Sequence, residues 1–190
     1  MRNIILRPDA EWRRIAAEPA RLSSLVLAYL LPLALIAPLA SACRLLITAG
    51  ASPADWAVRA RQTLQLVVGG FMVTPVSVLA MALVIYLVVP LYAGQRSFVG
   101  ALRIVILAGT PVWLSGIILI APLERFPLLA IVVLIALMHS LFLFYLGLHH
   151  IARVPRRDAA ECTAIVVAAG IVLSSVAGYY ASAAGFFPHM

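Results

Sequence analysis

Long apolar stretches, separated by short charged segments, set the pattern of this chain. Five long stretches contain no Asp, Glu, Lys or Arg, and they run over residues 22–43, 62–95, 104–123, 126–152 and 162–190. A helix needs about 20 apolar residues to cross the hydrocarbon core of a bilayer. The pattern therefore predicts an all-α, polytopic membrane protein with five transmembrane helices, at about 23–46, 64–90, 103–122, 126–148 and 161–184.

The longest charge-free stretch is too short for two full spans and a turn. We expect one long helix there, near Leu64–Val89, which is tilted or bent. The loop before it contains Ser52, Pro53 and Trp56, which together are typical of a capped helix start. This loop predicts a separate interfacial helix on the outer face of the membrane.

A short amphipathic helix is predicted between Pro8 and Pro19, before the first span. Asp9 can cap this helix, and Trp12 shares one face with Ile15. We expect it to lie on the cytoplasmic membrane surface, with Trp12 at the level of the headgroups. The alternative is a solvated lead-in that frays.

Arginine placement predicts the orientation of the chain. All 14 basic residues are Arg, and the net charge is +7. Ten of them lie in segments 1–21, 92–103 and 149–161, which would share one side of the membrane. The positive-inside rule puts that side, with the N-terminus, in the cytoplasm, and an odd number of spans puts the C-terminus in the periplasm. The chain is therefore predicted to consist of a cytoplasmic lead-in (residues 1–21), a five-span domain (22–184) and a periplasmic tail (185–190).

The third span carries a helix-breaking triplet, Gly109, Thr110 and Pro111, in the middle of an apolar run. In lipid, such a break survives because neighbouring helices and a Ser or Thr hydroxyl can bond the freed carbonyl. Thr110 is placed to do so. The triplet predicts a bent membrane helix that is packed among other helices.

Small residues recur every four positions in the fifth span, at Gly170, Ser174 and Gly178. This spacing is typical of a face on which two membrane helices pack closely. We therefore expect these three residues to form a helix-packing face.

No catalytic constellation is visible in the sequence, which contains no Gly-rich phosphate loop, no Cys-x-x-Cys and no paired carboxylates within a span. His139 is the one ionisable residue near the middle of a span. It either marks a proton or ligand site or is a neutral side chain that bonds a neighbouring helix. The adjacent His149 and His150 point to different helix faces, so an interfacial polar pair is favoured over a metal site. We expect no enzyme activity, no cofactor and no metal.

Several segments together resemble the Yip family, the Ypt/Rab-interacting membrane proteins, in its bacterial branch. They are the Glu11-Trp12 lead-in helix, the run from Ala101 through Ala108-Gly109-Thr110-Pro111-Val112-Trp113, and the run from Leu143 to Leu148 before a basic loop with a proline. The resemblance implies five spans, a cytoplasmic N-terminus and a lumenal or periplasmic C-terminus. It also implies a non-enzymatic membrane protein that works through partners.

The leading functional hypothesis is an integral inner-membrane adaptor or accessory subunit. Its partners would be anionic lipid headgroups and another membrane protein or a second copy of the chain; nucleic acid is not expected, because the basic residues lie at membrane edges. Candidate contacts are the arginines near the cytoplasmic edge, which otherwise serve only as a topology signal: Arg96, Arg103, Arg153, Arg156 and Arg157. The alternative is a small-molecule or lipid channel or transporter that uses the bent third span and His139.

Overall fold

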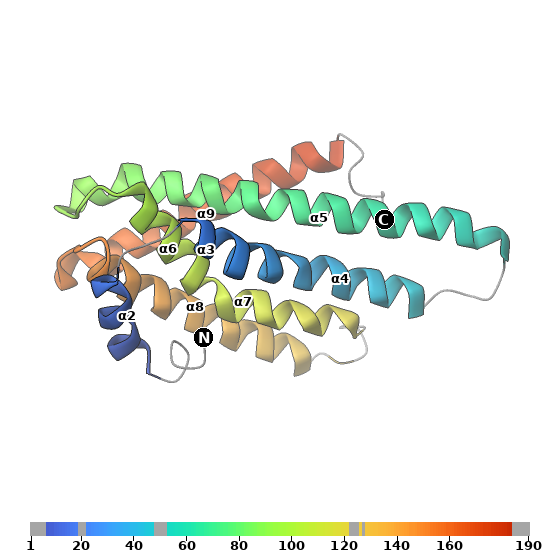
Figure 1. Cartoon of the computed structure of the whole chain (residues 1–190), viewed down its shortest axis with the longest axis horizontal. Helices are drawn as coiled ribbons and strands as arrows, with labels where there is room; N and C mark the ends of the chain where they lie inside the picture. The colour runs from blue at the N-terminus through green and yellow to red at the C-terminus, as the bar shows by residue number, and fades with distance from the viewer. Residues whose placement is uncertain (1–6, 19–21, 48–52, 122–125, 127, 184–190) are drawn as a thin grey trace.

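The protein is a bundle of long helices (Figure 1), seen here in a computed structural model that describes residues 7–18, 22–47, 53–121, 126 and 128–183. Among these residues there is no strand. The all-α prediction is therefore confirmed. The predicted helix end at Pro19 and the tail 185–190 lie outside the described residues.

Four helical stretches are long and apolar enough to cross a membrane: Leu22–Ile47, Trp56–Tyr92, Phe98–Ile120 and Leu128–His150. The protein is therefore a multi-pass membrane protein. The C-terminal helix α9 (Arg156–Ala183) is not among the four, in a search that covered the described residues alone. The fifth span and the orientation of the termini stay predictions.

The first two spans form an antiparallel pair. The first consists of α3 (Leu22–Leu25), a π-helical turn at Val26–Leu30 and α4 (Leu31–Ile47), and the second is α5 (Pro53–Val88) with a 3-10 turn at Val89–Tyr92. Gly70 of α5 faces Pro38 of α4, and a Cβ atom on Gly70 would lie 2.9 Å from the Pro38 Cγ. The two helices approach closely at this point because Gly70 has no side chain.

Helix α5 corrects one prediction about the outer loop. The expected interfacial helix around Trp56 is not separate, since α5 runs without a break from Pro53. No glycine or proline lies between Pro53 and Gly69 to end the helix. At 36 residues, α5 is about 54 Å long and exceeds the ~30 Å hydrocarbon core. Its first turns extend past the neighbouring helices (Figure 1). Ser52, the expected cap, lies outside the described residues.

The third span is divided into three short helices: α6 (Phe98–Ala108), α7 (Thr110–Ser115) and a 3-10 helix, η3 (Gly116–Ile120). The fourth span, α8 (Leu128–His150), is one continuous helix that packs against α6 and α7. The short N-terminal helix α2 (Pro8–Ala17) lies against the last turns of α8 (Figure 1). We call this part of the bundle the α2 end.

The buried core is concentrated at the α2 end. Its fully buried side chains come from α2, α5 and the turn after it, α6, α8 and the turn after it, and α9, and the largest are Trp12, Ile85, Ile104, Ile106, Leu143, Leu148, Val89 and Val154. The remainder of the bundle presents many apolar side chains on its surface, as expected where helices face lipid.

Candidate functional site at the α2 end

Trp12 attaches α2 to the bundle. The side chain is fully buried, and its ring lies against Gly147 of α8, where an added Cβ atom would be 3.0 Å from the Trp12 Cη2 and 3.0 Å from the Ile104 Cγ2. Trp12 therefore packs into the protein core, whereas the sequence analysis predicted that it faces the lipid headgroups. Gly147 leaves the space that the indole fills, and the sequence pattern of α2 alone could not reveal this pairing.

Two polar contacts also tie α2 to the bundle. The His150 Nε2 lies 2.8 Å from the Asp9 Oδ1, and the Arg103 Nη1 donates to the Glu18 carbonyl oxygen at 2.9 Å. Asp9 does not cap α2 as expected, because the N-cap position is Arg7 and has no side-chain cap bond. The hydrogen bond from His150 holds the pKa of Asp9 below its ordinary value, and the charge of Arg13 adds to this effect, partly opposed by burial.

His149 and His150 bond to different parts of the protein, as their adjacency on a helix predicts. The His149 Nδ1 lies 2.9 Å from the Val154 carbonyl oxygen, and the Arg156 Nε donates to the His149 Nε2 at 3.3 Å. The two imidazole centroids are 4.8 Å apart. The described residues contain no group of three or more metal-ligating side chains.

The two loops at the α2 end are joined to each other. The Gln95 amide donates to the Ala152 carbonyl oxygen at 2.6 Å, and the Tyr92 hydroxyl lies 3.1 Å from the Glu161 Oε1. Gly94 allows this approach, because an added Cβ atom would lie 2.9 Å from the Ala152 carbonyl oxygen. The connection fixes the start of α6 against the end of α8.

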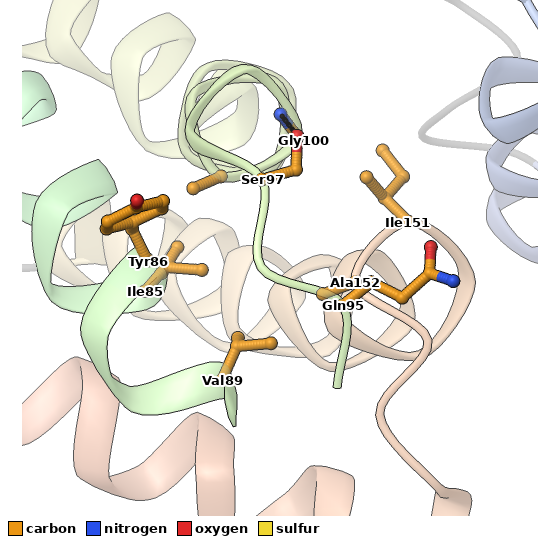
Figure 2. A pocket seen from close by; sticks show the side chains of 9 residues that line it. Ile85, Tyr86, Val89, Gln95, Ser97, Gly100, Ile151 and Ala152 are labelled. Carbon is orange, nitrogen blue, oxygen red and sulfur yellow. Dashed lines mark hydrogen bonds between the residues drawn. The ribbon is translucent and has the colours of Figure 1, made fainter. Parts of the chain in front are cut away.

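A small pocket lies between these loops and the end of α5, and Figure 2 shows its lining. Its volume is about 10 Å³, which is room for a single water molecule. A small-molecule substrate does not fit. The residues around it are Ile85, Tyr86, Val89, Gln95, Ser97, Gly100, Ala101, Ile151 and Ala152 (Figure 2).

Four of the five candidate arginines are exposed around the α2 end, and we call them the arginine rim: Arg96, Arg153, Arg156 and Arg157. The Arg96 guanidinium carbon lies 4.2 Å from the centre of the Tyr86 ring, which is a cation–π distance. Arg157 pairs with Asp158. Arg103 differs from the rim, because it is half-buried and bonds to α2.

The helix break in the third span lies at Gly109, between α6 and α7. The Thr110 hydroxyl donates to the Ile106 carbonyl oxygen at a long 3.4 Å, whereas the Ser140 hydroxyl of α8 donates to the Ala108 carbonyl oxygen at 2.6 Å. Both a local hydroxyl and a neighbouring helix therefore contribute. Sequence reasoning selected Thr110 and missed Ser140, whose role depends on how α8 packs against α6.

His139 has no hydrogen bond to a neighbouring helix among the described residues. Its Nε2 is buried without a partner, and its ring centroid lies 6.4 Å from that of Phe142. The described residues therefore offer no partner for this nitrogen, and the interpretation as a neutral histidine bonded to a neighbouring helix stays a prediction. A ligand or proton role for His139 stays a hypothesis.

The small residues of α9 differ in how closely other helices pack against them. Gly170 is buried against Met81 of α5, whereas an added Cβ atom on Gly178 would meet nothing within 4 Å. The side chain of Ser174 lies outside what the structure describes. Two further glycine contacts between helices were not predicted from the sequence: Gly70 with Pro38 and Gly116 with Ala37.

A family comparison matches the Yip1 domain over residues 2–177, which is most of the chain. No curated protein and no solved structure matches it. The match includes α2, the divided third span and the joined loops, so the expected kinship with the Yip family is confirmed, and the bacterial branch stays a prediction. The chain belongs to the Yip family of multi-pass membrane proteins, which the Yip1 domain defines.

Proposed function

We propose that this protein is a non-enzymatic adaptor or accessory subunit of a bacterial inner membrane. It crosses the membrane five times, with α9 as the fifth span and the α2 end in the cytoplasm. The Yip1 domain and the four long apolar helices support a membrane role. Ten arginines in the segments at the α2 end support the orientation, through the positive-inside rule.

The arginine rim is the observation that carries this proposal. It places four exposed cations around one end of the bundle, beside a pocket that holds no more than one water. Such a surface is suited to bind anions at the membrane interface rather than to enclose a substrate. Its ligands are anionic lipid headgroups and the acidic surface of another membrane protein. Each cation contributes about 1 kcal/mol near an anionic membrane surface.

Lipid binding by the rim can be measured with the purified protein in mild detergent. We expect native mass spectrometry to show bound phosphatidylglycerol or cardiolipin, and to show much less after Arg96, Arg153, Arg156 and Arg157 are changed to Gln. The matched control changes Arg59 and Arg61, near the start of α5, to Gln. Equal lipid binding by the rim variant and the control variant would overturn the proposal for lipid. Crosslinking of the rim in intact membranes then tests the protein partner.

The fifth crossing can be tested with a reporter fused after Met190. A reporter that is active in the periplasm and inactive in the cytoplasm is expected if α9 spans the membrane. At 28 residues, α9 is about 42 Å long, which is sufficient to cross. A cytoplasmic reporter would contradict both the fifth span and the proposed position of the C-terminus.

The second candidate function is a channel or transporter for a small molecule or lipid. The unpartnered Nε2 of His139 favours it, since buried polar groups in membrane helices usually have a partner or a task. The test is flux in reconstituted vesicles. His139→Ala should abolish any flux, whereas Phe142→Ala, at the neighbouring ring, should leave it near the original level. Unchanged flux in His139→Ala would remove this candidate.

A further inference from the structure

Arg96 differs from the other members of the arginine rim in how its side chain is held. Its guanidinium carbon lies over the Tyr86 ring, 4.2 Å from the ring centre. Tyr86 is half-buried, and its ring packs edge-on against that of Phe98, with 6.2 Å between the centroids and 80° between the planes. The aromatic ring that supports the guanidinium is therefore itself held by a second ring.

The backbone around Arg96 is also fixed on both sides. The Gln95 amide donates to the Ala152 carbonyl oxygen at 2.6 Å, and the Ser97 hydroxyl oxygen accepts from the Gly100 amide at 3.1 Å, as the N-cap of α6. Figure 2 shows Gln95, Ser97 and Gly100 around the same small pocket. Arg96 therefore has little conformational freedom to lose when it binds a ligand, which favours affinity.

The other three rim arginines are either already bonded or not supported by a ring. Arg156 donates to an imidazole of α8, and Arg157 donates to the Asp158 carboxylate. Among the described residues, Arg153 forms no hydrogen bond, ion pair or aromatic contact. Arg96 forms no hydrogen bond or ion pair within that part of the chain either, so its N–H donors remain available. Arg96 therefore combines a fixed position with unused donors.

The surroundings of Arg96 favour a lipid over a small anion. A guanidinium presents pairs of N–H donors that match two oxygens of a phosphate group, and it can bond them while it lies on an aromatic face. Leu83, one turn before Tyr86 on α5, is exposed, and so is Phe98. A tyrosine at this level of a membrane helix is typical of the interface. A fixed cation beside exposed apolar side chains fits an amphiphile, with its phosphate on Arg96 and its acyl chains along α5.

We propose that Arg96, positioned by Tyr86, is the member of the arginine rim that recognises the phosphodiester group of an anionic membrane lipid. The inference rests on the lipid binding proposed above for the whole rim, and it assigns the selective part of that binding to one cation. Arg153, Arg156 and Arg157 then contribute by charge alone. Tyr86 is a positioning residue, because it acts on the lipid through the Arg96 guanidinium.

Two charge-conserving variants test the role of Arg96. Phosphatidylglycerol is titrated into the purified full chain in mild detergent, and native mass spectrometry measures the bound fraction. Arg96→Lys keeps the charge but loses the paired donors, so its apparent affinity should fall about fivefold, the loss expected for one hydrogen bond. Arg153→Lys is the matched control, and it should stay within about twofold of the original protein because only its charge contributes. Equal affinities of the two variants would overturn the proposal.

Tyr86 is tested by variants that leave every arginine in place. Tyr86→Phe keeps the ring face and should bind phosphatidylglycerol as the original protein does, whereas Tyr86→Leu should bind about two- to fivefold more weakly. Tyr145→Leu makes the same change at a half-buried tyrosine of α8 and should have no effect. Unweakened binding by Tyr86→Leu, or an equal loss in Tyr86→Phe, would contradict the positioning role. Arg96→Lys changes an exposed side chain and keeps the proposal testable should Tyr86→Leu fail to fold.

Two further comparisons identify the source of the phosphate and separate this inference from the proposed function. Inorganic phosphate at millimolar concentration should not displace phosphatidylglycerol, and displacement would rule out the assignment to a lipid. If the variant without all four rim arginines loses the lipid while Arg96→Lys retains it fully, the proposed function stands and this inference fails. Unchanged binding by both variants would remove the two together.

Discussion

The two ends of α8 show how differently this protein uses one apolar helix. From Leu128 to Met138 most side chains are exposed, and from Ser140 to Leu148 most are buried. Both halves are mostly apolar, although the second half also contains aromatic residues, Ser140 and Gly147. The difference is the neighbours, because the second half packs under α2 and against α6, whereas the first half faces lipid. Hydrophobicity places the whole helix in the membrane. Small or polar residues at one end determine which neighbouring helices that end contacts.

The two tryptophans at opposite ends of the molecule give the largest expected contrast. Trp12→Ala should lower the free energy of unfolding by about 3 kcal/mol, since a fully buried indole is removed from the space over Gly147. Trp56→Ala should change it by less than about 0.5 kcal/mol, because Trp56 is 52% exposed. Reversible unfolding in mixed micelles measures both. Equal losses would show that Trp12 is not a core residue.

Two glycines provide a matched pair for helix packing. Gly70→Val should destabilise the protein by about 1–3 kcal/mol, because the added side chain meets the rigid Pro38 ring. Gly178→Val has open space around it and should be neutral or slightly stabilising. Thermal inactivation in detergent ranks the two variants. A larger loss for Gly178→Val would indicate that Gly178 packs against another molecule.

Ser140→Ala tests the support of the helix break at Gly109. Loss of the bond to the Ala108 carbonyl oxygen should cost about 1 kcal/mol, since that carbonyl is left without its partner in α8. Ser175→Ala is the control, because its hydroxyl is exposed and bonds within its own helix. Unfolding in mixed micelles compares them. An effect no larger than that of the control would mean that the helix break does not need α8.

Protonation of Asp9 at low pH should weaken the attachment of α2 to the bundle. The folded-state pKa of Asp9 lies below its unfolded value, so its stabilising contribution is complete above about pH 4 and is lost as the pH falls through the folded-state pKa. The hydrogen bond from His150 is the main cause. We expect the exchange protection of α2 to fall below about pH 4. Asp9→Asn should lack this fall, and an unchanged fall in that variant would exclude Asp9.

The sequence predicted the helices well because charge-free length is a local property. The break in the third span at Gly109 and the single helix in the longest apolar stretch follow from residues that are close in the chain, whereas the third span begins at Phe98 rather than near residue 103 as predicted. The contacts of the α2 end did not follow, because they join distant residues such as Trp12 with Gly147 and Asp9 with His150. An amphipathic helix with one tryptophan is compatible with a membrane surface or with a protein surface. Only the glycine on α8 distinguishes these two surfaces, and its position relative to α2 depends on the tertiary fold.

The arginine positions were predicted as one group and the structure divides them. Arg103 lies within reach of α2 because α6 begins at Phe98 and turns that residue toward Glu18. The rim arginines lie on loops and on the first turn of α9, where exposure follows from the ends of the helices. Counting charges therefore identified the end of the bundle at which the arginines lie. It did not identify which arginine forms a hydrogen bond inside the bundle.

The account depends most on which side of the membrane carries the α2 end. Single cysteines at Arg153 and at Val58, in a chain without Cys43 and Cys162, can be labelled in spheroplasts with a maleimide that does not cross membranes. We predict that the cysteine at Val58 reacts in intact spheroplasts and the cysteine at Arg153 reacts only after permeabilisation. Labelling of Arg153→Cys in intact spheroplasts, with Val58→Cys protected, would contradict the proposed orientation and with it the cytoplasmic arginine rim.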